Sequence, residues 1–471
     1  MQSVLGQEAA RLNGAVRVTA HGIDVVNAEA LQSEVMDDLV RDAVFGDEAI
    51  RSGARALLWE LGAAVGVRPA SIHDVYMARG RGECSGFTVP AINIRMLAYD
   101  SARAVFRAAL KCDAAAILLE IARSEIAYTD QRPGEYVAVM IGAALREGYH
   151  FPLFIQGDHC QVNAKKYQAD PEAEVGEVKK LIAEEIASGF FNVDVDTSTL
   201  VDLSLATLDE QQRTNYERAA EITRYIRKHE PDDVTVSVGA EIGEVGFKNS
   251  TVEELDAFMG GYNRTLAAMG DYVGISKISV QTGTSHGGVV LPDGSIAEVK
   301  LDIAALEALS KRAREGYRLA GAVQHGASTL PSNAFGNFAR VETCEIHLAT
   351  NFQNIVYDHP ALPAELRGRM YAWLDENAQS ERKPADSIEQ FYYKARKKAI
   401  GPFKQELWSL PASVRQQISA DLEQTFTFLF EQLRIGKTAD LVRRLTRIPT
   451  LHYGMIAPAG VLAEDDPDAG E

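Results

Sequence analysis

The sequence predicts an α/β protein built on a TIM (β/α)8 barrel, with additional helical segments at both ends. Eight short apolar runs, many of them rich in β-branched residues, alternate with longer amphipathic stretches between residues 87 and 350. A barrel of this type usually takes roughly 250 residues, which suits this region. A doubly wound open sheet is the alternative, but the sequence lacks the GxGxxG turn that is typical of such sheets.

The apolar runs give the expected strands in chain order. They are FTVPAINI (87–94), AAAILLEIA (114–122), PLFIQGDH (152–159), FNVDVDTS (191–198), VTVSVGAEIG (234–243), VGISKISVQTG (273–283), GAVQHGAS (321–328) and CEIHLAT (344–350). The stretches between them have apolar residues at helical spacing. The clearest helical candidates are SARAVFRAALKC, EVGEVKKLIAEEIASG, DEQQRTNYERAAEITRYIRKH, TVEELDAFMGGYNRTLAAMG and LDIAALEALSKRAREG.

The chain divides into four expected regions. Residues 1–80 form a helical N-terminal extension, and residues 81–360 form the barrel, which is the catalytic domain. Residues 361–455 form a helical extension with repeated aromatic and charged residues, which we expect to make oligomer contacts or to cover the barrel. Residues 456–471 are acidic and poor in bulky apolar residues, so we expect a disordered tail.

The composition limits the classes of partner. The formal net charge is −18, which disfavours nucleic acid and anionic membranes because both require a positive surface. The four cysteines are scattered, and there is neither a secretory leader nor an apolar stretch of roughly 20 residues. We therefore expect a cytoplasmic protein with reduced thiols, assembled as a homo-oligomer (a dimer or larger).

Three histidines close apolar runs in similar local sequence. His159 follows LFIQGD, His286 follows ISVQTGTS and His325 follows GAVQ. The carboxyl ends of barrel strands open onto a common site, so these imidazoles are expected to meet there. Three neutral imidazoles with one open position are typical of a catalytic zinc site. The alternative is that each histidine is a separate polar residue hydrogen-bonded to nearby backbone.

Three carboxylates occupy similar positions at strand ends. Asp158 precedes a proposed metal ligand and could carry a proton for a substrate hydroxyl, or it could orient His159. Asp196 and Glu241 could hold a second cation or an alternative metal position, or they could cap the helices that follow. The glycine-flanked setting of Glu241, in GAEIGEVG, favours the functional interpretation for that residue.

Two loops of small residues follow the proposed ligands: SHGG (285–288) and HGAST (325–329). Their backbone N–H groups, together with the hydroxyl of Ser328, could receive a phosphate at the barrel rim.

These segments together resemble the class II, metal-dependent fructose-bisphosphate aldolase family over residues 87–351. The resemblance implies that Asp158 in GDHC is the catalytic acid/base and that His159, His286 and His325 bind Zn²⁺. It also implies cation-binding roles for Asp196 and Glu241, with a second divalent or monovalent cation allowed. The resemblance further implies that the phosphate of the substrate is contacted by Gly287, Gly326 and Ser328.

The sequence departs from the family pattern near the last strand. The family usually presents Asn and then Asp or Asn two residues later, before Thr, whereas this chain has His347, Ala349 and Thr350. His347 and Thr350 are the candidate substrate contacts there. The second glycine after the last zinc histidine is replaced by Ala327. The family also has a mobile loop after the fifth strand, with a glutamate that moves the proton of the triose. In this chain three residues are candidates for that glutamate: Glu244, Glu253 and Glu254.

The resemblance implies reversible aldol cleavage of a ketose bisphosphate, with fructose 1,6-bisphosphate as the expected substrate. The products would be dihydroxyacetone phosphate and glyceraldehyde 3-phosphate. One alternative is a related metal-assisted lyase or isomerase acting on another sugar or sugar phosphate. A second alternative, motivated by the altered last strand, is a noncatalytic barrel subunit of an aldolase complex.

Overall fold

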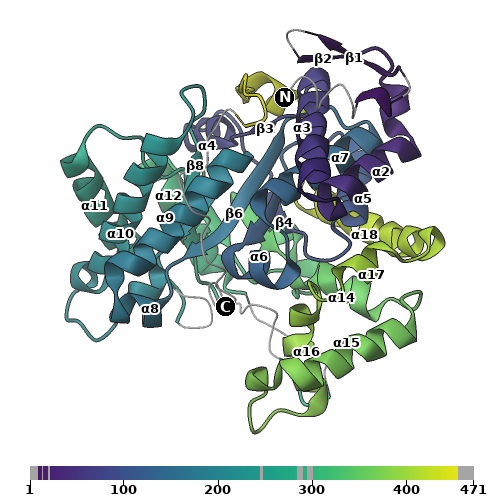
Figure 1. Cartoon of the computed structure of the whole chain (residues 1–471). Helices are drawn as coiled ribbons and strands as arrows, with labels where there is room; N and C mark the ends of the chain where they lie inside the picture. The colour runs from purple at the N-terminus through teal and green to yellow at the C-terminus, as the bar shows by residue number, and fades with distance from the viewer. Residues whose placement is uncertain are drawn as a thin grey trace.

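Eight parallel strands close into a barrel, with β6 paired to β7, which confirms the expected TIM-barrel fold with helical segments around it (Figure 1). The structure is a computed structural model that describes residues 9–12, 14–19, 22–243, 248–283, 290–293 and 301–454. The barrel strands are β4 (Val89–Asn93), β5 (Leu118–Ala122), β6 (Leu153–Gln161), β7 (Asn192–Asp196), β8 (Ser237–Glu241), β9 (Lys277–Val280), β10 (Ala322–Gln324) and β11 (Glu345–Leu348).

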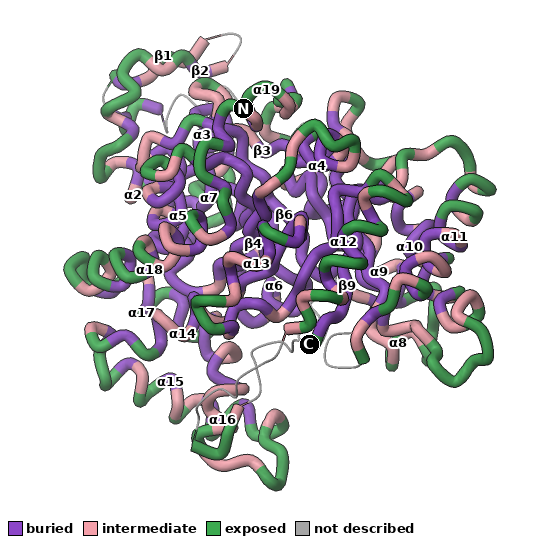
Figure 2. The backbone as a smooth tube through the Cα atoms, turned by 180° about the vertical axis from the view of Figure 1, so that it is seen from behind, coloured by how far each residue is buried: buried purple, intermediate pink, exposed green. Residues whose placement is uncertain are grey.

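Helices follow the strands and enclose the barrel. They are α5 (Ala98–Cys112), α6 (Arg123–Thr129), α7 (Pro133–Glu147), α8 (Ala164–Ala169), α9 (Pro171–Ser188), α10 (Leu208–His229), α11 (Val252–Met269), α12 (Ile303–Tyr317), α13 (Gly336–Arg340) and α14 (Thr350–Asp358). Local sequence fixes several of their ends. Thr207 and Glu210 form a capping box at the start of α10, and Gly148 ends α7 with a φ of 71° that suits glycine. The strands lie buried inside this helical layer (Figure 2).

The N-terminal segment packs against one side of the barrel. It contains β1 (Val16–Thr19), β2 (Gly22–Val25), α2 (Glu34–Phe45), α3 (Glu48–Val65), β3 (Pro69–Ala70) and α4 (His73–Gly80). Helices α2 and α3 pack on α7, and β3 extends the sheet beside β6. The antiparallel β1–β2 ribbon was not expected, because these four-residue strands give little periodic signal.

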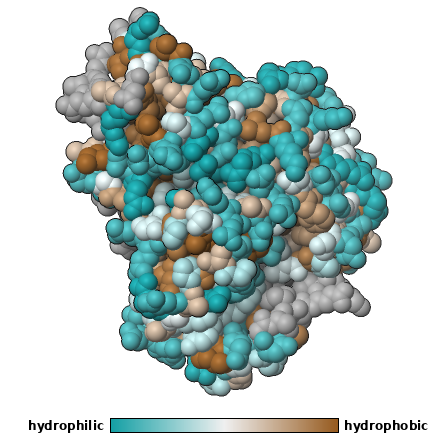
Figure 3. Space-filling model, turned by 90° about the vertical axis from the view of Figure 1, so that its right-hand side faces the viewer, coloured by the Kyte–Doolittle hydropathy of each residue, from teal (hydrophilic) through white to brown (hydrophobic). Residues whose placement is uncertain are grey.

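The C-terminal helices pack at several places around the barrel, with the last of them on α4 of the N-terminal segment. They are α15 (Ala364–Asn377), α16 (Ile388–Ala395), α17 (Lys404–Trp408), α18 (Ala412–Gln432) and α19 (Ala439–Leu445). Helix α18 packs on α5, and its Phe426 and Phe430 are fully buried. The face shown in Figure 3 is largely hydrophilic, with scattered apolar residues. Within the described part of the chain, no helix has the length and apolar character needed to cross a membrane.

Polar side chains fill the layer of the barrel interior that lies beneath its mouth. The Nζ of Lys277, on β9, lies 2.7 Å from Gln156 Oε1, 2.8 Å from Asp194 Oδ1 and 2.5 Å from Glu345 Oε1. The amide of Gln156 also donates to Glu120 and Glu345, at 3.0 Å each. Branched apolar side chains usually fill this position in TIM barrels. The interior of this barrel is instead a buried network of charges and hydrogen bonds.

Gly239 on β8 provides the space for this network, and its replacement by alanine is expected to lower the free energy of unfolding by about 1–3 kcal/mol. A Cβ at residue 239 would collide with Asp194 Oδ1 and would lie 2.8 Å from Cε of Lys277. Gly176, in α9, is the matched control because no atom lies within 4 Å of an added Cβ there. Its replacement by alanine should stabilise the helix by about 0.5–1 kcal/mol. Urea unfolding of both variants checks the difference, and equal effects would contradict it.

Candidate functional site

A β-bulge places two consecutive side chains inside the barrel mouth. The register between β6 and β7 shifts between Gly157 and Cys160, and His159 has a φ of 41°. In a regular strand, neighbouring side chains point to opposite faces. The bulge allows Asp158 and His159, which are 5% and 4% exposed, to reach the same interior. A non-glycine residue in this left-handed backbone conformation costs about 1–3 kcal/mol of free energy, and such strain is common at functional sites.

One cluster at the mouth contains His159, Asp196 and Glu241, whose ligand atoms lie within 4.8 Å of one another. The Nδ1 of His159 is 3.2 Å from Asp196 Oδ2 and 3.6 Å from Glu241 Oε2. Burial opposes the charged imidazole, but the neighbouring carboxylates outweigh burial and raise the pKa of His159 to about 10. Burial and the charge of Asp196 raise the pKa of Glu241. The cluster therefore has a strong negative potential that favours a bound cation.

A second cluster contains Asp158, Asp194, His325 and His347, again within 4.8 Å of one another. Within this cluster, the ring centroid of His325 is 3.9 Å from that of His347. It is also 4.3 Å from that of His159, so His325 connects the second cluster to the first. The hydroxyl of Ser279 lies 3.1 Å from Nε2 of His325. Strands β6, β7, β10 and β11 therefore bring two predicted histidine ligands, the predicted acid/base and His347 together.

The other predicted site residues have different placements. His286, Gly287 and Glu244 lie outside the described residues. Gly326 follows His325 with a φ of 65°, and Thr350 is the first residue of α14. Glu253 is exposed on α11, whereas Glu254 caps the same helix by accepting a hydrogen bond from the backbone N–H of Thr251 at 2.8 Å.

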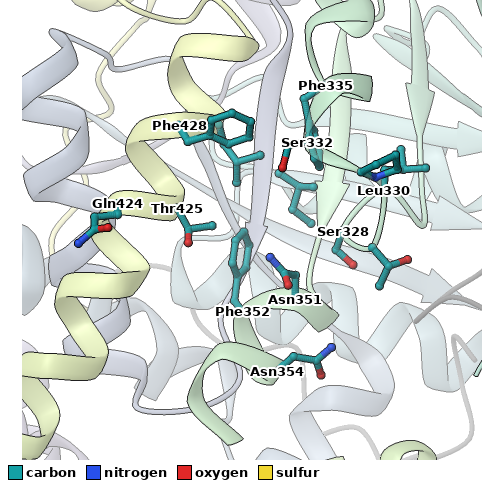
Figure 4. Close-up of a pocket in the computed structure, with 14 residues that line it drawn as sticks. Ser328, Leu330, Ser332, Phe335, Asn351, Phe352, Asn354, Gln424, Thr425 and Phe428 are labelled. Carbon is teal, nitrogen blue, oxygen red and sulfur yellow. The ribbon is translucent and has the colours of Figure 1, made fainter. Parts of the chain in front are cut away.

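Ser328 lines a cavity of about 540 Å³ beside the barrel mouth. Asn351 and Phe352 line it from α14, and Gln424, Thr425 and Phe428 line it from α18 (Figure 4). Its polar side chains are hydroxyls and amides without charge. Helix α18, whose aromatic spacing predicted a packing surface, therefore also supplies part of a cavity wall.

Arg95, Tyr128 and Lys397 form a further group near the site, and no sequence pattern marked these three residues. Arg95 follows β4, and Lys397 lies in the short helical turn η5 (Arg396–Ala399) of the C-terminal extension. Arg95 Cζ and Lys397 Nζ lie 6.0 and 5.8 Å from the ring centroid of Tyr128. The Tyr128 side chain is buried, and its hydroxyl makes no hydrogen bond with any residue that the structure describes. Arg95 donates a hydrogen bond to Oδ1 of Asn93, the last residue of β4, at 3.1 Å, so this group adjoins the mouth.

The side chains at the mouth fit a divalent metal ion. Imidazole nitrogens and carboxylate oxygens are the donors that zinc and related ions use. His159, His325 and Glu241 are buried here, and Asp196 accepts hydrogen bonds from Gln161 and from Ser198 Oγ, the latter at 2.7 Å. Such outer contacts orient carboxylates for ligation.

Comparisons with known proteins give the family and the fold of the chain. The sequence model of the family "Fructose-bisphosphate aldolase class-II" matches residues 81–406. A protein described as a probable tagatose 6 phosphate kinase from Sinorhizobium meliloti 1021 is 15% identical with a TM-score of 0.51, covering 75% of this chain and all of its own. This likeness supports the fold alone.

Two further solved structures are similar at lower TM-scores. A fructose-bisphosphate aldolase from Campylobacter jejuni is 17% identical with a TM-score of 0.44, over 80% of this chain and 98% of its own. A fructuronate-tagaturonate epimerase from Cohnella laeviribosi is 14% identical with a TM-score of 0.49, over 93% of this chain and 90% of its own. Because the family model matches more than half of the sequence, the chain belongs to the class II fructose-bisphosphate aldolase family.

Proposed function

We propose that this protein is a zinc-dependent aldolase that cleaves a ketose bisphosphate, with fructose 1,6-bisphosphate as the expected substrate. The products are dihydroxyacetone phosphate and glyceraldehyde 3-phosphate. The observation that carries the proposal is the position of Asp158, which shares the barrel mouth with the imidazoles of His159 and His325. Asp158 Oδ1 lies 3.8 Å from His159 Nε2 and 3.1 Å from His347 Nδ1. A proton carrier is thus adjacent to a set of metal ligands.

The residues of the mouth have distinct roles in the proposed reaction. His159, His325 and His286 would hold the metal, with Glu241 and Asp196 as carboxylate ligands. When bound, the ion supplies Lewis acidity at a carbonyl oxygen. Asp158 takes the proton of the C4 hydroxyl as the C3–C4 bond breaks, and it returns this proton in condensation. Thr350 contacts the triose part of the substrate, at the position where the family usually has Thr.

The substrate's phosphates are assigned to two sides of the mouth. Gly287, Gly326 and Ser328 contact one phosphate through backbone N–H groups and a hydroxyl. Lys397 is suited to the other, because its ammonium lies 5.8 Å from the Tyr128 ring, beside the ion pair of Arg95 and Glu125.

Product analysis tests the reaction class. The purified protein, loaded with Zn²⁺, is incubated with fructose 1,6-bisphosphate and with other ketose phosphates, and the products are identified by mass spectrometry. We expect two three-carbon phosphates from fructose 1,6-bisphosphate. Products that keep all six carbons would contradict an aldolase and indicate an isomerase or epimerase. Absence of turnover on every substrate would favour a noncatalytic subunit.

Replacement of Lys397 by methionine is expected to raise KM for the bisphosphate by about 10–100-fold with a smaller effect on kcat. A hydrogen bond to a charged group contributes about 1.5–3 kcal/mol, and this one would be lost in the variant. Burial and the nearby charge of Arg95 lower the pKa of Lys397 to about 7, so a bound phosphate would relieve an existing repulsion. Lys398→Met is the matched control, since Lys398 lies 3.5 Å from Glu381. Equal KM values in the two variants would contradict the assignment.

A further inference from the structure

Four carboxylates surround the imidazole of His347 on β11. Its Nδ1 lies 3.0 Å from Glu120 Oε2 and 3.1 Å from Asp158 Oδ1. Its Nε2 lies 2.8 Å from Glu345 Oε1 and 3.5 Å from Asp194 Oδ2. His347 is 5% exposed, so these contacts are shielded from solvent. The two ring nitrogens of a histidine need only one hydrogen-bond partner each, so four carboxylates are more than this imidazole requires.

Several buried atoms at this position are poorly satisfied. Both ring nitrogens of His347, together with Glu120 Oε1, make no hydrogen bond of acceptable geometry with the residues that the structure describes. Unsatisfied buried polar atoms are costly and call for a partner such as an ion. Such atoms beside several buried carboxylates are what a cation-binding position presents.

Negative charge is in excess around His347. Lys277 contacts two of the four carboxylates, Asp194 and Glu345. Buried charges in proteins are paired or coordinate metals. A divalent cation would reduce this excess.

We propose that Asp158, Asp194, His325 and His347 form a second divalent-cation site, deeper in the barrel than the cluster of His159, Asp196 and Glu241. The two carboxylates and His347 come from three different strands, His325 directly follows a fourth, and the ligand atoms lie within 4.8 Å of one another. This donor set suits Zn²⁺ or Mn²⁺. The proposal goes beyond the proposed function and does not depend on which reaction the protein catalyses.

The two clusters are close enough for paired ions. His325, which also holds the ion of the proposed function, would serve both ions as a bridging imidazolate, with one ring nitrogen for each. Its ring centroid is 4.3 Å from that of His159 in the first cluster. A carboxylate has two oxygens, so ligation through Oδ1 of Asp158 is compatible with proton transfer through Oδ2. His347 is therefore a metal-binding residue in this proposal.

Metal stoichiometry tests the proposal without any activity measurement. Metal-free protein is dialysed against excess Zn²⁺, unbound metal is removed, and zinc per chain is measured by mass spectrometry. We expect two ions in the wild type, one in His347→Asn and one in Asp196→Asn. The matched control, Glu185→Gln, changes a buried carboxylate on α9 outside both clusters and should keep two. One ion in the wild type, or two in His347→Asn, would overturn the proposal.

A second measurement uses the wild type alone, in case the variants do not fold. Mn²⁺ is titrated into metal-free protein and followed by electron paramagnetic resonance. Two ions a few ångströms apart give a spin-coupled spectrum, which we expect at saturation. A spectrum of isolated Mn²⁺ at saturation would overturn the paired site. Failure of the proposed function would instead appear as missing cleavage products while the metal content stayed at two.

Discussion

Replacement of Asp158 by asparagine is expected to lower kcat for fructose 1,6-bisphosphate cleavage by about 10²–10⁴-fold, the usual contribution of a general acid/base. The amide keeps the size of the side chain but cannot accept and return the hydroxyl proton. Oδ1 of Asp158 lies 3.8 Å from His159 Nε2 and 3.1 Å from His347 Nδ1, so the carboxylate is among the side chains of the barrel mouth.

Two control measurements separate this loss from other causes. At least one metal ion per chain should remain in Asp158→Asn, because His159, Asp196 and Glu241 are unchanged. Replacement of the exposed Asp202, outside the site, by asparagine should leave kcat within about twofold. A variant at residue 158 that kept more than a tenth of the wild-type kcat would show that another group carries the proton.

Replacement of Lys277 by methionine is expected to lower the free energy of unfolding by about 3–5 kcal/mol. The change removes the ammonium that contacts Asp194 and Glu345, and both carboxylates then remain buried without it. Burial opposes the charge of Lys277, but these two carboxylates outweigh burial and raise its pKa, so the ammonium is retained at neutral pH. Urea denaturation measures the loss.

The control for this prediction is an ion pair near the surface. Lys179→Met removes a contact with Glu221, whose side chain is 25% exposed, and should cost at most about 1 kcal/mol. The double variant Lys277→Met/Glu345→Gln should recover part of the loss, because it removes one of the two unpaired charges. A cost below about 1 kcal/mol for Lys277→Met would mean that the network does not stabilise the barrel.

The sequence predicted the eight strands because each buried strand is a short apolar run followed by an amphipathic helix. The run FNVDVDTS, for example, contains β7 (Asn192–Asp196), and CEIHLAT contains β11 (Glu345–Leu348). Strand order in a closed barrel follows chain order, so the polar residues at strand ends were expected to converge. We therefore expected one barrel mouth to contain Asp158, His159, Asp196, Glu241 and His325.

Features that depend on tertiary contacts were not predictable in this way. The bulge at Gly157–Cys160 turns His159 inward, and no local sequence signal marks the left-handed backbone of a histidine. In the sequence, Lys277 and Glu345 are single charged residues within apolar strands. Their ion pair depends on closure of the barrel, which brings β9 and β11 to the same interior. Lys397 is far from Tyr128 in sequence, so its position depends on how the C-terminal helices pack.

Metal removal followed by metal return is the most direct measurement of the central claim, which is that cleavage requires a divalent cation held by His159, His325 and the carboxylates of the barrel mouth. The protein is treated with chelator, dialysed, and assayed for triose phosphate formation while Zn²⁺ is added back in known amounts. We predict a fall in activity of about 10³-fold or more, since Lewis-acid stabilisation contributes several kcal/mol, and recovery in proportion to the metal bound. Full cleavage activity in protein shown to be free of metal would contradict the claim.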